Sequence, residues 1–130
     1  MKTVTICSSN RFAGEVGEFA EKLKSLGVPV LVPHYYTANY GGLEAVEKDH
    51  DKRFIAMGLT LDHFQKIRKG DVIFIYNKDG YSGNSTTLEI GYATALGKPI
   101  YALSDKDSEI CRDILFEGYA ATPEELAKVL

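Results

Sequence analysis

The sequence has few of the residues that build disulfide frameworks or metal centres. Its 130 residues include two cysteines, Cys7 and Cys111, which are too few for a disulfide framework and favour a reducing, cytoplasmic location. The three histidines, His34, His50 and His63, lack the close spacing of metal ligands. We therefore expect no metal site, and nothing in the sequence implies an organic cofactor.

Long hydrophobic runs are also missing. The N-terminal run Val4–Cys7 has the length of a strand and not that of the apolar core of a signal peptide. No stretch approaches the roughly 20 apolar residues that a membrane-spanning helix needs. The net charge is −3, with lysine and arginine scattered along the chain, so we expect neither a membrane nor a nucleic-acid polymer as partner.

What is present indicates one α/β domain over residues 1–130. Hydrophobic residues make up 45% of the chain, enough for a core of its own. Apolar runs of strand length alternate with segments of helical periodicity, which predicts right-handed crossovers and a parallel sheet with helices on both faces. The predicted strands are 2–7, 28–32, 71–76, 100–103 and 113–116. Five helices are predicted: one after Ser9, one over 43–57, one over 60–70, one that ends at Gly97 and one that begins after Thr122. The common flavodoxin-like strand order, 2-1-3-4-5, would place the first and third strands side by side.

The stretch 80–99 is the centre of the functional interpretation. It follows a run that fits a buried strand, breaks at Gly80 and Gly83, and then enters a helix whose first turn is expected to carry Glu89. Ligands bind at this edge of open parallel sheets. A second interpretation is structural, with Glu89 closing a capping box on the backbone N–H of Thr86.

Two segments resemble a known enzyme family. The first segment consists of residues 88–93, Leu-Glu-Ile-Gly-Tyr-Ala, followed by residues 97–99, Gly-Lys-Pro. It is similar to the active-site segment of the nucleoside 2-deoxyribosyltransferase superfamily, which includes deoxyribonucleoside 5′-monophosphate N-glycosidases. Residues 7–11, Cys-Ser-Ser-Asn-Arg, resemble the family's first loop, which touches base and phosphate. The resemblance implies that Glu89 is the nucleophile and that a covalent glycosyl–glutamate forms. A helix N-terminus would keep this carboxylate ionised.

The residue expected to protonate the leaving base differs from the one that the family usually has. The family often takes it from the helix before the third strand, and there this chain has His63, with Asp62 beside it. A histidine can transfer a proton near neutral pH. The alternative is that both side chains lie on the surface of an amphipathic helix.

Substrate contacts are expected from two loops. Hydroxyls, backbone N–H groups and a guanidinium in the first loop can form an anion site for a 5′-phosphate, although an ordinary helix cap with a solvated arginine explains the same residues. The second loop adds polar donors, with a glycine where family phosphate binders often have serine, and nearby tyrosines that can stack on a base or belong to the core. The candidates are Ser8, Ser9, Asn10, Arg11, Tyr81, Gly83, Asn84, Ser85 and Tyr92.

The resulting prediction is an N-glycosidase or deoxyribosyltransferase acting on a nucleoside or nucleoside 5′-monophosphate. Water as acceptor would make the protein a hydrolase, and a second base would make it a transferase. The family resemblance also implies a homodimer or higher homo-oligomer. Two alternatives remain open, a non-catalytic nucleotide sensor on the same fold and an NAD glycohydrolase.

Overall fold

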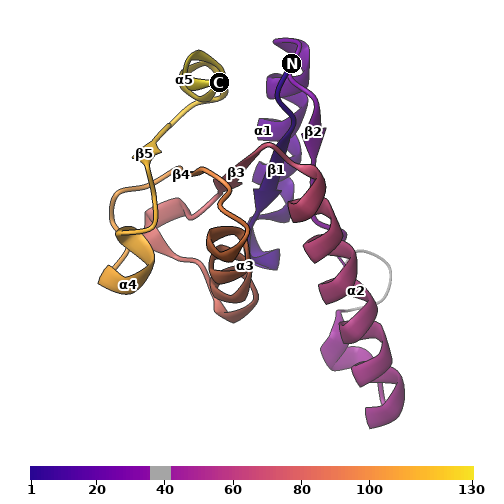
Figure 1. The fold of residues 1–130 in the computed structure, drawn as a ribbon. Helices are drawn as coiled ribbons and strands as arrows, with labels where there is room; N and C mark the ends of the chain where they lie inside the picture. Colours follow the sequence, from indigo (N-terminus) through magenta and orange to yellow (C-terminus); the bar gives the residue numbers. More distant parts are fainter. Residues whose placement is uncertain (36–41) are drawn as a thin grey trace.

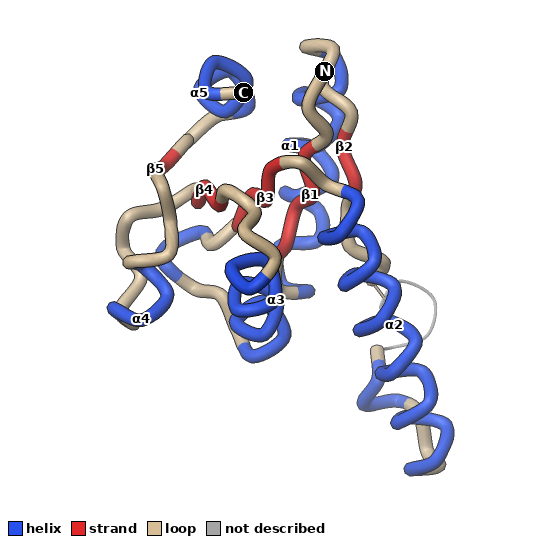
Figure 2. The backbone as a smooth tube through the Cα atoms, viewed as in Figure 1, coloured by secondary structure: helices blue, strands red, loops and turns tan. Residues whose placement is uncertain are grey.

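A five-stranded parallel sheet forms the centre of the computed structural model, which describes residues 1–35 and 42–130 (Figures 1 and 2). The strand order is β2-β1-β3-β4-β5, which confirms the predicted order. The strands are β1 (Val4–Cys7), β2 (Val30–Leu31), β3 (Val72–Ile75), β4 (Ile100–Ala102) and β5 (Gly118–Tyr119). β1 and β3 pair along their full length, so their carboxyl ends lie side by side.

Helices cover both faces of the sheet, as the alternating pattern predicted. They are α1 (Ala13–Ser25), α2 (Asp49–Lys69), α3 (Asn84–Ala95), α4 (Ile110–Asp113) and α5 (Pro123–Val129). Phe74 points to the face where α1 and α5 lie and stacks on Phe19 at 4.9 Å between ring centroids. Its strand neighbours Ile73 and Ile75 point to the opposite face and pack with Ile67 of α2 and Ile90 of α3. Each face of the sheet therefore has its own apolar core.

The fifth strand is not where the sequence pattern placed it. Residues 113–116 lie at the end of α4 and in the turn after it, and the strand that pairs with β4 is Gly118–Tyr119. Leu115 and Phe116 are apolar because they pack against the α2–α3 side of the core from this turn. A short apolar run does not distinguish these two structures.

The two helices predicted over 43–57 and 60–70 are also different in the structure. A short 3₁₀ turn at Leu43–Ala45 is followed by one continuous helix, α2, from Asp49 to Lys69. Thr60 does not cap a new helix, because its hydroxyl donates to the carbonyl of Ala56 within α2 at 2.7 Å. The N-terminal half of α2 extends past the sheet (Figure 1). No helix in the described part of the chain is long and apolar enough to cross a membrane.

α3 begins earlier than predicted, which changes the position of Glu89. Gly83, with φ +83°, precedes the first helical residue, Asn84. Glu89 is therefore in the second turn, and it does not form the predicted capping box with Thr86. The last helix begins after Thr122 as predicted, where the Thr122 hydroxyl accepts from the Glu125 N–H at 3.1 Å and the Glu125 carboxylate accepts from the Ala121 N–H at 2.8 Å.

Candidate functional site

A cavity of about 170 Å³ opens beside the carboxyl ends of β1 and β3. The loop after β1, the middle of α2 and the first turns of α3 form its walls. Its polar lining residues are Ser8, Asn10, His34, Tyr35, Thr60, His63, Ser85 and Glu89. The cavity therefore lies at the sheet edge where the sequence placed a ligand site.

Three buried side chains from three different elements meet beside this cavity, and two of them, His63 and Glu89, line it. Cys7 ends β1, His63 lies on α2 and Glu89 lies on α3. His63 Nε2 is 3.3 Å from Cys7 Sγ and 3.9 Å from Glu89 Oε2. Only 4% of the His63 side chain and 12% of the Glu89 side chain are exposed, and Cys7 is fully buried. The sheet, α2 and α3 thus hold a carboxyl group against an imidazole, largely out of water.

Burial controls the protonation of Glu89. It raises the pKa of this carboxyl to about 8, although a hydrogen bond with Cys7 opposes the shift. The expectation of an ionised carboxylate at the helix N-terminus is therefore wrong for the resting protein at neutral pH. The effect of a helix dipole falls off within the first turn, and Glu89 is in the second.

The same burial keeps His63 neutral. Loss of hydration lowers its pKa to about 4, and the positive charge of Lys66 adds to this effect. The two groups form a coupled pair, so the apparent pKa values belong to the pair. Between pH 4 and 8 the pair holds one proton, which lies on Glu89 in the resting state.

Two further residues beside the cavity were assigned no individual role from the sequence. Cys7 was placed only at the end of a strand and the start of the segment resembling the family's first loop, and burial, followed by the charge of Glu89, raises the pKa of its thiol. Tyr35 belongs to a stretch rich in tyrosine, residues 34–42, of which residues 36–41 lie outside the described part. Its hydroxyl is buried in the cavity wall, and burial raises its pKa to about 12, although the nearby Ser8 hydroxyl opposes the shift. The tyrosine cluster was the available signal for Tyr35.

The candidate residues of the first loop are divided between the cavity and the surface. Ser8 and Asn10 line the cavity, while the Ser9 hydroxyl accepts from the Arg11 N–H at 3.4 Å and caps a 3₁₀ turn. The Arg11 guanidinium is exposed and lies over the Tyr81 ring, 3.5 Å from its centroid. Arg11 and Tyr81 therefore form a cation–π pair that does not line the cavity.

The remaining candidates are also divided. Ser85 lines the cavity, whereas Gly83 and Asn84 do not. Tyr92 packs between the helices, with its ring 4.4 Å from that of Phe64. Asp62 is on the exposed side of α2, where its carboxylate pairs with Lys66 at 2.9 Å.

Comparison with known proteins gives similarity of fold only. No protein-family model and no curated protein matches the sequence. Among solved structures, the chain is similar to a 2-deoxyribosyltransferase from the psychrotolerant bacterium Bacillus psychrosaccharolyticus, with 18% identity and a TM-score of 0.62 over 95% of this chain and 89% of that one. It is also similar to a conserved protein from Enterococcus faecalis V583, with 14% identity and a TM-score of 0.51 over 99% of this chain and 87% of that one.

The buried carboxyl predicts an unusual dependence of stability on pH. Glu89 keeps its proton up to about pH 8 when folded but loses it above about pH 4.5 when unfolded, so its burial costs more stability as pH rises between these values. We expect Glu89→Gln, which stays neutral, to gain stability relative to the wild type by about 1.4 kcal/mol per pH unit across this window. The lowered pKa of His63 affects the stability of both proteins equally, so it cancels from the difference in stability between them.

Thermal or urea unfolding of both proteins at pH 5, 6.5 and 8 measures this difference. Glu18→Gln, an exposed glutamate on α1, is the matched control and is expected to show no such trend. A constant difference between Glu89→Gln and the wild type would mean that Glu89 is ionised in the folded protein.

Proposed function

We propose that this protein cleaves the N-glycosidic bond of a nucleoside or nucleoside 5′-monophosphate through a covalent glycosyl–Glu89 intermediate. The observation that carries the proposal is the buried Glu89–His63 pair, which holds one proton beside a cavity at the carboxyl edge of the sheet. The fold similarity to a 2-deoxyribosyltransferase supports it. No metal takes part in the proposed chemistry.

The first step is proton transfer within the pair. The resting state, with a neutral carboxyl and a neutral imidazole, is a poor nucleophile beside a poor acid. Moving the proton from Glu89 to His63, across the 3.9 Å between Oε2 and Nε2, produces a carboxylate and an imidazolium together. The two opposite charges stabilise each other where water is excluded.

Bond cleavage follows from this charged form. A Glu89 oxygen attacks the anomeric carbon as the carbon–nitrogen bond breaks, and the bonding electron pair leaves with the base. The His63 imidazolium gives its proton to the departing base. Glu89 is then a glycosyl ester, and His63 is neutral.

The second half returns the site to its starting state. In hydrolysis, neutral His63 accepts a proton from water while the water oxygen attacks the anomeric carbon and the ester bond breaks. The products are the free sugar, or sugar phosphate, and the original protonated pair. A second base in place of water would give transfer instead.

The walls of the cavity support a substrate with a polar sugar and a flat apolar base. Ser8, Asn10 and Ser85 provide hydroxyl and amide groups for the sugar or its phosphate, and Leu59 and Phe64 provide an apolar wall for the base. We propose that the surface candidates Ser9, Arg11, Tyr81, Gly83 and Asn84 extend this site outward toward a 5′-phosphate. With Asp62 paired to Lys66 and Tyr92 packed between helices, His63 is the proposed acid.

Base release from a substrate panel tests the proposal. Wild-type protein is incubated with nucleosides, nucleoside 5′-monophosphates and NAD, and the free base is measured by chromatography. We expect Glu89→Gln to lose base release by about 10³-fold or more, as for removal of other catalytic nucleophiles, while the Glu18→Gln control retains it. Quenched wild-type reactions should contain a chain heavier by one sugar.

Other outcomes distinguish the alternatives. Binding of nucleotides without base release would indicate a sensor, and release of nicotinamide from NAD alone would indicate an NAD glycohydrolase. Preference for monophosphates over nucleosides would support the first loop as a phosphate site. Full activity of Glu89→Gln would contradict the mechanism.

The pH dependence of base release tests the role of His63. The pair has its single proton only between about pH 4 and 8, so the rate should fall on both sides of this range. Below it Glu89 cannot become a nucleophile, and above it His63 has no proton to give. Initial rates measured from below pH 4 to above pH 8 in chelating buffer check the profile.

His63→Gln provides the matched variant, because glutamine retains hydrogen bonding but cannot transfer a proton. We expect a rate lower by about 10²-fold or more on ordinary nucleosides. Above about pH 8, where Glu89 is ionised without His63, substrates whose base is a cationic leaving group need no proton and should release their base at nearly the wild-type rate. An equal loss on both kinds of substrate would assign His63 a structural role instead.

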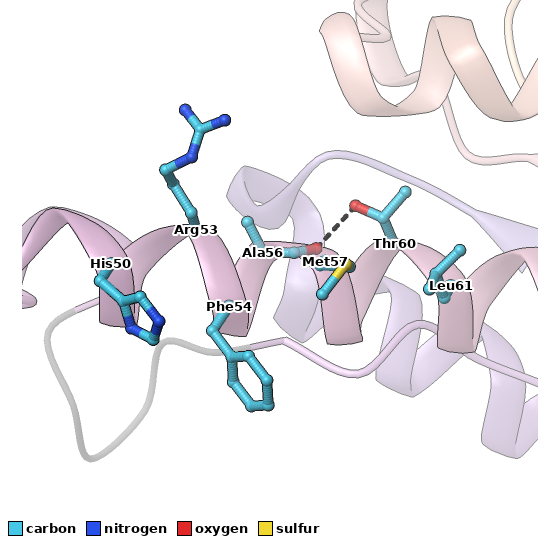
Figure 3. Close-up of a pocket in the computed structure, with 7 residues that line it drawn as sticks. All are labelled: His50, Arg53, Phe54, Ala56, Met57, Thr60 and Leu61. Atoms are coloured by element: carbon cyan, nitrogen blue, oxygen red, sulfur yellow. Dashed lines mark hydrogen bonds between the residues drawn. The ribbon is translucent and has the colours of Figure 1, made fainter.

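We also propose that a second copy of the chain covers the exposed face of α2. Phe54, Met57 and Leu61 have 66%, 53% and 57% of their surfaces exposed around an open hollow of about 630 Å³ (Figure 3). Contiguous exposed apolar surface of this kind marks interaction sites. Ala56 and Thr60 line both this hollow and the cavity beside Glu89, so a second copy seated there would extend the wall of the cavity.

The oligomeric state should therefore depend on this face. We expect sedimentation of the wild type to give a mass at least twice the 14.4 kDa of the chain, and Met57→Lys to give the single-chain mass with lower base release. Gln65→Lys, an exposed position on the same helix, is the control and should keep the wild-type mass. A monomeric wild type at 100 μM would contradict this prediction.

A further inference from the structure

The buried cluster of Cys7, His63 and Glu89 has a second chemical capacity. Its thiol sulfur, imidazole nitrogen and carboxylate oxygen lie within 4.8 Å of one another. These residues come from β1, α2 and α3, which are far apart in the sequence, so no ligand spacing was visible there. We propose that the cluster binds one Zn²⁺ ion, and that the ion inhibits the protein by occupying the two atoms needed for catalysis.

The donor set favours zinc over harder cations. Cysteine sulfur, histidine nitrogen and carboxylate oxygen are the ligand types that Zn²⁺ takes in proteins. Calcium and magnesium require oxygen ligands, of which this cluster offers a single carboxyl group. The sulfur excludes a site specialised for either of these ions.

Two of the three distances between the donors are close to those of a tetrahedral site. Zinc bonds of about 2.3 Å to sulfur and about 2.0–2.1 Å to nitrogen and oxygen place S and N about 3.5 Å apart, and N and O about 3.3 Å apart. The corresponding separations are 3.3 Å between Cys7 Sγ and His63 Nε2 and 3.9 Å between His63 Nε2 and Glu89 Oε2. Cys7 Sγ and the Glu89 carboxylate lie within 4.8 Å of each other, compared with about 3.5 Å in a tetrahedral site, so this pair would have to close by up to about 1.3 Å. The adjacent cavity leaves room for water as fourth ligand.

Charge balance also supports an ion at this position. Binding releases the thiol proton of Cys7 and the carboxyl proton of Glu89 to solvent, while His63 coordinates in its neutral form. The two negative ligands then neutralise the 2+ charge of the ion. The complex of the ion with its three ligands then has no net charge. A neutral complex avoids the large desolvation cost of burying a net charge among side chains that are this little exposed to solvent.

Inhibition follows from the identity of the ligand atoms and rests on the proposed function. Coordination through Glu89 removes the proposed nucleophile, and coordination through His63 Nε2 removes the proposed acid. Cys7 contributes affinity for the ion without taking part in the proposed bond cleavage. A change at Cys7 can therefore separate metal binding from catalysis.

Spectroscopy with Co²⁺ as a substitute for Zn²⁺ tests the site directly. We expect metal-free wild-type protein to bind one equivalent of Co²⁺ with a thiolate-to-cobalt absorption band, and Zn²⁺ to abolish the band by displacement. Cys7→Ser should lose the band and bind Zn²⁺ at least about 100-fold more weakly, since even supporting groups around a metal change affinity by about 10–100-fold. Cys111→Ser, which changes the exposed thiol, is the matched control and should keep both properties.

Base release with and without Zn²⁺ tests the regulatory part. Wild type and Cys111→Ser should lose activity in Zn²⁺ and regain it with EDTA, and Cys7→Ser should require at least about 100-fold more Zn²⁺ for the same inhibition. The absence of a thiolate band in the wild type, or its loss in Cys111→Ser, would overturn the site whether or not Cys7→Ser folds. Zinc binding without any base release would instead contradict the proposed function while leaving the metal site intact.

Discussion

The burial of Glu89 against His63 is the constraint on which the site depends. Two groups that are both charged in water at moderately acidic pH share a space that is nearly closed to solvent, with 12% and 4% of their side chains exposed. An isolated charge in such a space would lose its hydration at a large cost in free energy. The pair therefore keeps a single proton and has no net charge. Full pairing of β1 with β3, and the packing of α2 against α3, maintain this arrangement.

Much of the fold was predictable because it follows from repeated physical patterns. Runs such as Val72–Ile75 are apolar at every position because helices cover both faces of the sheet, and parallel crossovers then restrict the possible strand orders. The errors occurred where local signals compete with tertiary packing. Leu115 and Phe116 were predicted to lie in a strand, but they pack from a turn. A separate helix was predicted to begin at residue 60, but the Thr60 hydroxyl donates to the Ala56 carbonyl within one longer helix.

The site was predictable to a smaller degree. The sequence resemblance pointed to Glu89 and His63, and the structure places them together. The resemblance alone, however, gives no information about which of the two side chains is protonated. The argument for an ionised Glu89 considered only its own helix, whereas the pKa of its carboxyl is controlled by burial under α2 and β1. Cys7 could not be identified from the sequence either. His63 and Glu89 are 56 and 82 residues away from it and meet it only in the folded chain.

A single electrostatic requirement connects the two chemical capacities of the cluster. Below about pH 8, Glu89 can become an anion in this buried position only when a positive charge appears beside it. In the proposed reaction that charge is the His63 imidazolium, which exists only while the proton is in transit to the leaving base. In the proposed inhibited state it is a zinc ion, whose charge also draws the proton from Cys7. The cation that accompanies Glu89 therefore decides whether its carboxylate attacks a sugar or remains bound to a metal.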